Sequence, residues 1–313
     1  MKQHAYFIQR GLSIVEVMVT LAIGMVVTLG IVGVMGLNQQ NLRITESLSE
    51  SQENARMAFE LIARDVRQAR DTSCGPVAPT PANLNGNWWG QWRPVLGFDG
   101  ATVAGAVGFG DGIGQRVAGT QALQAQSGGE TRIIQKITGT KLDLQSNADT
   151  LSSGPVIVCD LQAASLHIAT AAGAKAITTA PAVTVNDPDN PPFQVSRLTA
   201  TTWYIGNNGR ATEGGRSLYR IRLQANGTPV TEEILPGIVD LSVRYHTKNA
   251  ADFTDVLPAT PAAWNEINAV ELTLVSESTQ RNVTSEVTNN ELAGSDGRIR
   301  RQITHVISLR NTL

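Results

Sequence analysis

A single carboxylate, Glu16, lies inside a long apolar run and is the residue whose chemistry most needs an explanation. It follows the dipeptide of Gly11 and Leu12 closely, and no other Asp, Glu, Lys or Arg occurs between it and Arg43. A charge near the end of a membrane-spanning helix costs about 2.5 to 3.5 kcal/mol, so a chain that keeps one usually supplies a partner. Glu16 is therefore a candidate for an ion pair.

Other chemistry-bearing patterns do not complete a catalytic site. The glycine cluster at 108–114 lacks the G-x-G-x-x-G spacing of a nucleotide loop, and the acidic run at 186–190 lacks the downstream Glu of a calcium loop. The four histidines are scattered: His4, His167, His246 and His305. No G-x-S-x-G or H-E-x-x-H motif is present. We predict a non-enzymatic protein that needs no cofactor and no metal.

The element that positions Glu16 is an apolar segment at 12–37, which would span roughly 39 Å as a helix. This length is enough to cross a bilayer. Lys2 and Arg10 precede the segment, so the positive-inside rule places residues 1–11 in the cytoplasm and the rest of the chain outside. No small-residue cleavage site follows the segment, so any cleavage is expected before it.

Within this span, small residues recur every four positions at Thr20, Gly24 and Thr28. Such a face lets another helix approach closely in a membrane. We predict a helix-packing face here. Ordinary membrane-helix composition is the alternative.

After residue 37 the pattern becomes amphipathic, without a proline to stop the helix. The apolar positions fall on one helical face: Ile44, Leu48, Ala55, Phe59, Ile62, Val66 and Ala69. The opposite face is charged. We predict one continuous helix from Leu12 to about Arg70, with an exported amphipathic half at 38–73 whose apolar stripe packs on a partner.

The remaining residues, 74–313, predict an antiparallel β domain. Short alternating runs mark strands in its final third, and Asn226-Gly227 predicts a hairpin turn. Residues 161–192 are rich in Ala, Thr, Asn and Pro and are expected to form an insertion of uncertain order. The fold class is thus α+β, with a long N-terminal helix packed on an antiparallel sheet.

Three tryptophans, Trp88, Trp89 and Trp92, occur in a proline-punctuated stretch at the start of this domain. They could form an exposed contact patch, but aromatic residues in such a stretch more often cap a core. We expect core capping.

Charge and cysteine content restrict the partners and the compartment. Basic residues number 25 and acidic residues 27, which excludes the basic footprint of a nucleic-acid-binding protein.

The two cysteines, Cys74 and Cys159, both fall in the part expected outside the cytoplasm, where thiols tend to pair. We predict a disulfide between them. Two buried free thiols are the alternative.

The N-terminal residues resemble the class III signal of type IV pilins and pseudopilins. The resemblance lies in Arg10 and Gly11, then Leu12 and the residues up to Glu16, and then the apolar run. It implies that a prepilin peptidase cuts between Gly11 and Leu12 and N-methylates Leu12. Most members of the family have Phe at this position, so Leu12 departs from the common pattern.

Further segments are similar to PilW-type minor pilins. They are the helix ending at 52–69 with Cys74 after it, and three C-terminal stretches at 217–220, 239–245 and 308–311. Residues 76–215 show no such likeness. The length of the chain favours this group over the related type II secretion pseudopilins of the J class, which are usually shorter.

The resemblance implies a role for Glu16 in assembly, through an ion pair with the new amino group of Leu12 on a neighbouring subunit. It also implies a minor pilin that primes type IV pilus assembly and lies at or near the filament tip. The implied location is the inner membrane, with the C-terminal domain in the periplasm, and later a pilus at the cell surface. Implied partners are the prepilin peptidase, other minor pilins, the major pilin, the inner-membrane assembly platform, membrane lipid and a tip adhesin, without direct nucleic-acid binding.

Two rival functions remain at this point. One is a minor pseudopilin of the J class in type II secretion. The other is a bitopic, membrane-anchored periplasmic binding protein or enzyme that keeps its N-terminal leader uncut.

Overall fold

The computed structural model describes residues 13–75, 77–81, 84, 86–160, 162–185, 192–281 and 296–310. The predicted leader and its cleavage site, Gly11 and Leu12, lie outside these residues. The first described element is helix α1 (Ile14–Gln68), whose 55 residues extend for roughly 80 Å. It has no internal proline, and it ends just before Arg70, whose φ of 72° no longer fits a helix.

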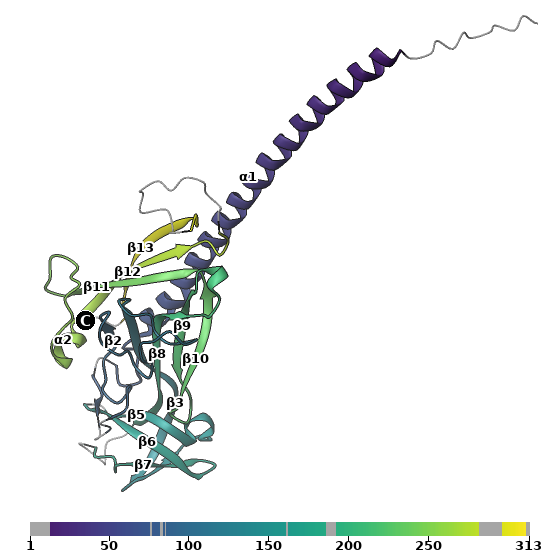
Figure 1. The fold of residues 1–313 in the computed structure, drawn as a ribbon. Coiled ribbons are helices and arrows are strands. Elements are labelled where there is room, and N and C mark those ends of the chain that lie inside the picture. Colours follow the sequence, from purple (N-terminus) through teal and green to yellow (C-terminus); the bar gives the residue numbers. More distant parts are fainter. Residues whose placement is uncertain are drawn as a thin grey trace, which may run out of the picture.

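Helix α1 has two unlike halves (Figure 1). Its N-terminal half projects from the domain with its apolar side chains exposed, and it is long and apolar enough to cross a membrane. Its C-terminal half lies against the β strands and buries one face. The single helix expected from the sequence therefore changes its environment along its length.

The domain contains two sheets, whose strands are β1 (Thr80–Pro81), β2 (Val95–Phe98), β3 (Ala122–Thr138), β4 (Lys141–Leu144), β5 (Ser153–Cys159), β6 (Ala164–Gly173), β7 (Ala176–Ala180), β8 (Phe193–Asn207), β9 (Arg216–Leu223), β10 (Pro229–Pro236), β11 (Ile238–Thr247), β12 (Ile267–Glu277) and β13 (Arg300–Ser308). Three short helical segments join them: η1 (Asp149–Ser152), η2 (Ala211–Glu213) and α2 (Pro261–Asn265). Strands β11, β12 and β13 form the smaller sheet in that order. The predicted hairpin is confirmed, because β9 and β10 pair antiparallel around Asn226-Gly227.

Strands of the larger sheet close into a barrel. Strand β8 pairs with β5 on one side and with β3 on the other, while β3 also pairs with β4. The ring runs β3, β4, β7, β6, β5, β8, and every pairing in it is antiparallel. A separate apolar cluster, which includes Leu142, Ile177 and Val195, fills it. In Figure 1 strands β5, β6 and β7 lie at the end of the molecule farthest from the start of α1.

The barrel changes the interpretation of residues 161–192. The sequence suggested an insertion of uncertain order, whereas the structure forms β6 and β7 between 164 and 180 and pairs them within the barrel. Residues 161 and 186–191 lie outside the described part. These strands are difficult to find in the sequence because Ala and Thr, rather than large apolar residues, fill most of their positions.

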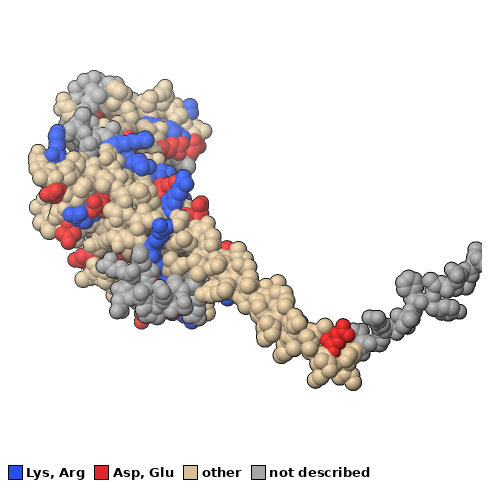
Figure 2. Space-filling model, turned by 90° about the horizontal axis from the view of Figure 1, so that it is seen from above, with Lys and Arg blue, Asp and Glu red and all other residues tan. Residues whose placement is uncertain are grey.

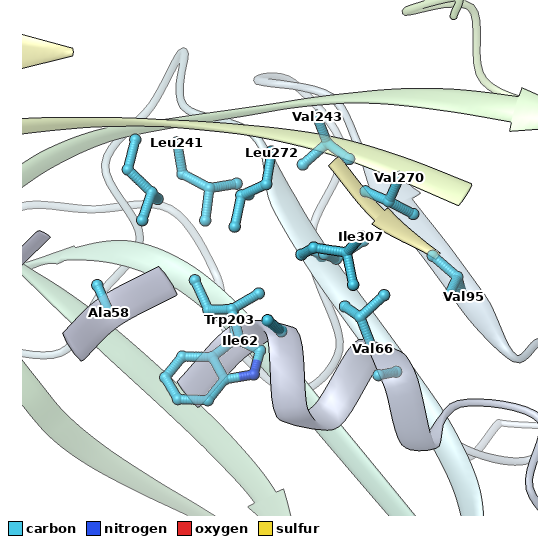
Figure 3. Packing of buried hydrophobic residues seen from close by; sticks show 14 of the residues in the cluster. Ala58, Ile62, Val66, Val95, Trp203, Leu241, Val243, Val270, Leu272 and Ile307 are labelled. Atoms are coloured by element: carbon cyan, nitrogen blue, oxygen red, sulfur yellow. The ribbon is translucent and has the colours of Figure 1, made fainter. Parts of the chain in front are cut away.

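The main core lies between α1 and the two sheets. Figure 3 shows Ala58, Ile62 and Val66 of the helix grouped with Leu272 and Ile307 of the small sheet. Trp203 of β8 belongs to the same cluster and is fully buried. The α+β class and the packing of a long helix on an antiparallel sheet are therefore confirmed.

The tryptophan-rich segment caps a second core. Trp89 and Trp92 are buried among side chains that include Leu166 and Leu198, and Trp88 packs against them while partly exposed. This is the core-capping arrangement expected from the sequence.

Candidate functional site

Glu16 lies in the first turn of α1, on the exposed apolar half. A carboxylate is favoured there by the partial positive charge of a helix N-terminus. Among the described residues, no cation lies within ion-pair distance of it. Figure 2 shows the projecting part of the helix as a rod without basic residues, with acidic atoms near its described end. Glu16 is thus the isolated charge that the sequence indicated.

The small-residue face at Thr20, Gly24 and Thr28 lies on the same exposed half. The Thr20 hydroxyl donates to the carbonyl of Glu16 at 3.0 Å, and the Thr28 hydroxyl donates to the carbonyl of Gly24 at 2.7 Å. A Cβ atom at Gly24 would meet nothing within 4 Å. The hydroxyls are therefore satisfied within the helix, which leaves a narrow face that lipid or another helix can contact without a polar partner.

Polar contacts fix the C-terminal half of α1 in place. The hydroxyls of Ser51 and Ser276 are 2.8 Å apart in a buried pair between the helix and β12. Thr279 donates to the carboxylate of Glu50 at 3.2 Å. Such directional contacts set the rotation and height of the helix on the sheets, which apolar packing alone specifies less tightly.

Asp65 is a largely buried carboxylate of this interface, with 14% of its side chain exposed. Its Oδ2 atom accepts a hydrogen bond from Nε1 of Trp203 at 3.0 Å. Burial raises the pKa of the Asp65 carboxyl, and this outweighs the lowering effects of the Trp203 hydrogen bond and of Arg64. The charged form is thus held at a cost to stability.

Cys74 and Cys159 are joined by a disulfide, with their Cα atoms 5.2 Å apart. Cys74 lies shortly after the end of α1, and Cys159 ends barrel strand β5. The bond therefore links the helix terminus directly to the barrel.

A cleft of about 670 Å³ opens beside the C-terminal end of α1. Its basic lining residues come from three elements: Arg64 of α1, Arg197 of β8, and Arg220 and Arg222 of β9. Sequence reasoning did not find this cluster, because strand pairing brings together arginines that are far apart in the chain.

Comparison with known families identifies the C-terminal part of the chain. Residues 202–311 match the family model PilW, described as type IV pilus-assembly protein W. This match over the C-terminal third supports a PilW-type type IV pilus protein. No curated protein and no solved structure gives a significant match. The match begins within β8 and runs past the end of β13, so barrel strands β3 to β7 lie outside it.

The match covers the three C-terminal stretches, 217–220, 239–245 and 308–311, that are similar to PilW-type minor pilins in the sequence. The matched family is one of type IV pilus assembly, which is an assembly role and not that of a known enzyme family. Within the described residues, no group of three or more His, Cys, Asp or Glu side chains is arranged to hold a metal ion.

Proposed function

We propose that this protein is a minor pilin that primes type IV pilus assembly and lies at or near the filament tip. The observation that carries the proposal is the division of α1 into an exposed apolar half, with Glu16 in its first turn, and a half packed in the domain core. An apolar helix that projects from its own domain needs lipid or other helices around it. Membrane storage followed by helical packing in a filament meets that need.

Glu16 fixes the axial position of one subunit's helix relative to the helix of its neighbour. After cleavage before Leu12, the new amino group would lie at the same end of the helix as the Glu16 carboxylate. Contact between this carboxylate and the Leu12 amine of a neighbouring subunit would neutralise two charges in a medium of low dielectric constant. Because a buried charge without a partner is costly, a neighbour shifted along the helix axis would be disfavoured.

The barrel supports a position near the tip. It lies beyond the C-terminal end of α1, on the side of the domain away from the apolar half (Figure 1). Another subunit stacked directly above this one would have to accommodate the barrel. A terminal position avoids this steric conflict.

The proposed partners follow from this placement. The prepilin peptidase would cut between Gly11 and Leu12 and methylate Leu12. The apolar helix would contact membrane lipid, the assembly platform of the inner membrane, other minor pilins and the major pilin, partly through Thr20, Gly24 and Thr28. The domain would face the periplasm before assembly, and a tip adhesin is a further proposed partner.

The test is Glu16→Ala in cells where the variant is the sole copy. We expect unchanged membrane insertion and fewer surface pili, counted by electron microscopy. Glu53→Ala is the matched control, because Glu53 is an exposed carboxylate on the packed half of the same helix. Normal piliation with Glu16→Ala would overturn the register mechanism.

Mass spectrometry of the purified protein tests the processing step. A chain that begins at methylated Leu12 supports the pilin assignment. An intact leader that begins at Met1 would support a membrane-anchored protein that never enters a filament.

A further inference from the structure

The cleft lies next to the C-terminal end of α1, on the same face of the larger sheet that α1 packs against. Alternate residues of a strand point to the same face, so Arg197, Thr199 and Thr201 share the face on which Trp203 contacts the helix. Beyond the end of α1 this face is no longer covered, and the side chains change from apolar to basic and hydroxyl-bearing. Ser127 of β3 adds another hydroxyl, 2.6 Å from that of Thr199.

We propose that this cleft binds an acidic peptide segment of a partner protein, with the arginines receiving its carboxylates. Its volume of about 670 Å³ falls within the range of about 300 to 1,000 Å³ that ligand pockets occupy. The proposal rests on the cleft itself and does not depend on the register mechanism of Glu16.

The charges around the cleft are unequally matched. Arg220 and Arg222 both bind the Glu232 carboxylate, through hydrogen bonds of 2.6 Å and 3.2 Å. Arg64 lies 3.6 Å from Asp65. A third carboxylate, Glu130, also interacts with Arg197. Three carboxylates therefore face four arginines, and the remaining positive charge attracts an additional negative charge.

Arg197 is the lining residue with the most buried hydrogen-bond donors left unused. Its Nε and Nη2 atoms are buried and make no hydrogen bond with any described residue. These two nitrogens form one edge of the guanidinium, which can hold both oxygens of a carboxylate at once. Burial lowers the pKa of Arg197, which reflects a cation that is poorly solvated where it is. Rotation of its long side chain toward an incoming carboxylate would satisfy both groups.

The lining favours a peptide over a nucleic acid or a lipid. Among the described residues that line it, none is aromatic, so no base could stack there. On the face of the domain shown in Figure 2, acidic side chains lie beside the basic ones, which weakens the attraction for a polyanion. The cleft also lies at the end of α1 opposite to the apolar half, so a bilayer that holds that half is roughly 40 Å away.

Backbone groups of the β9–β10 turn at Ala225 and Asn226 complete the lining and can contact a peptide main chain.

The experiment uses the full chain in detergent and a fluorescein-labelled tetraglutamate peptide, with binding followed by fluorescence anisotropy. We expect saturable binding that weakens with salt and falls about tenfold or more in Arg197→Gln, because one charge-assisted contact is lost. Arg222→Gln, a second lining variant, should also weaken binding. Arg67→Gln is the matched control, since Arg67 is exposed on the same helix as Arg64 but does not line the cleft.

Competitors and controls decide the outcome. Unlabelled tetraglutamate should displace the probe, whereas tetralysine should not. Equal weakening in Arg67→Gln and the two lining variants would show a general charge effect and overturn the site. Absence of peptide binding, or binding of a thymidine oligonucleotide or inorganic phosphate in its place, would overturn the peptide assignment. Circular dichroism confirms that each variant is folded, and piliation assays are not involved.

Discussion

Trp203 donates its indole N–H to the carboxylate of Asp65, 3.0 Å away, across the interface between β8 and α1. The Trp203 side chain is fully buried, and the Arg220 guanidinium lies 5.5 Å from the centre of its ring. The contact therefore joins the last turns of the helix, the centre of the larger sheet and the edge of the cleft.

The first prediction concerns the charge of Asp65. Because burial raises the pKa of this carboxyl above its ordinary value of 3.8, the folded protein binds the proton more tightly than the unfolded chain. The contribution of Asp65 to stability is therefore greatest at low pH and is lost as pH rises through the folded-state pKa. Asp65→Asn keeps an oxygen acceptor for Trp203 and removes the buried charge. We expect it to be neutral or stabilising at pH 7.

Urea unfolding of the full chain in detergent, followed by tryptophan fluorescence, measures this effect. The advantage of Asp65→Asn over the unsubstituted protein should shrink as pH is lowered toward 4. A difference that stays constant between pH 4 and pH 7 would contradict the electrostatic account, since other titrating groups are common to both proteins.

The second prediction concerns the apolar face of α1. Ile62 is fully buried between the sheets, so Ile62→Ala should reduce the free energy of unfolding by about 2 to 5 kcal/mol. Met57 lies on the same helix with 43% of its surface exposed, and Met57→Ala should change stability by less than about 0.5 kcal/mol. Equal effects of the two substitutions, measured by urea unfolding, would show that the packed face is assigned wrongly.

The apolar stripe of α1 was predictable because its positions repeat with helical period. Ala55, Ile62, Val66 and Ala69 are indeed buried. The same reasoning missed Ser47 and Ser51, which are buried closer to the membrane half. A small hydroxyl residue allows close approach of helix and sheet. Ser51 finds a buried partner in Ser276, whereas the buried Ser47 hydroxyl has none among the described residues. An apolar pattern cannot reveal this.

The barrel and the cleft were not predictable because both depend on long-range pairing. The barrel closes only because β8 pairs with β3 and β5 together, and nothing local in any of these strands specifies both neighbours. The cleft forms because Thr201 lies opposite Arg222 in the β8–β9 register, beside a helix that ends near residue 68. A sequence read without contacts lacks this information.

The third prediction concerns the bond between Cys74 and Cys159, which closes a loop over a sequence separation of 85. In the chain-entropy model such a loop contributes about 4 to 5 kcal/mol. The double variant Cys74→Ala/Cys159→Ala should lose stability of this order, and a reducing agent should destabilise the unsubstituted protein but not the variant. Thiol titration of the denatured, non-reduced protein should find no free thiol. Two free thiols would show that the bond does not form.

The fourth prediction concerns Arg116, a fully buried cation in the loop region between β2 and β3. Its guanidinium donates to the carbonyl of Thr102 at 2.7 Å, to that of Asp99 at 2.5 Å and to that of Thr120. Burial lowers its pKa to about 10, which still leaves it charged at neutral pH. One fully buried side chain thus ties together three backbone carbonyls of this region.

Arg116→Met should therefore reduce the free energy of unfolding by about 3 kcal/mol, since three backbone carbonyls lose a charged, fully buried donor. Arg116→Lys keeps the charge but cannot reproduce the planar fork, so it should rescue only part of this loss. Arg56→Met is the control, because the Arg56 side chain is 76% exposed and makes only a surface ion pair. If Arg116→Lys were as stable as the unsubstituted protein in urea unfolding, charge and not donor geometry would hold the loop.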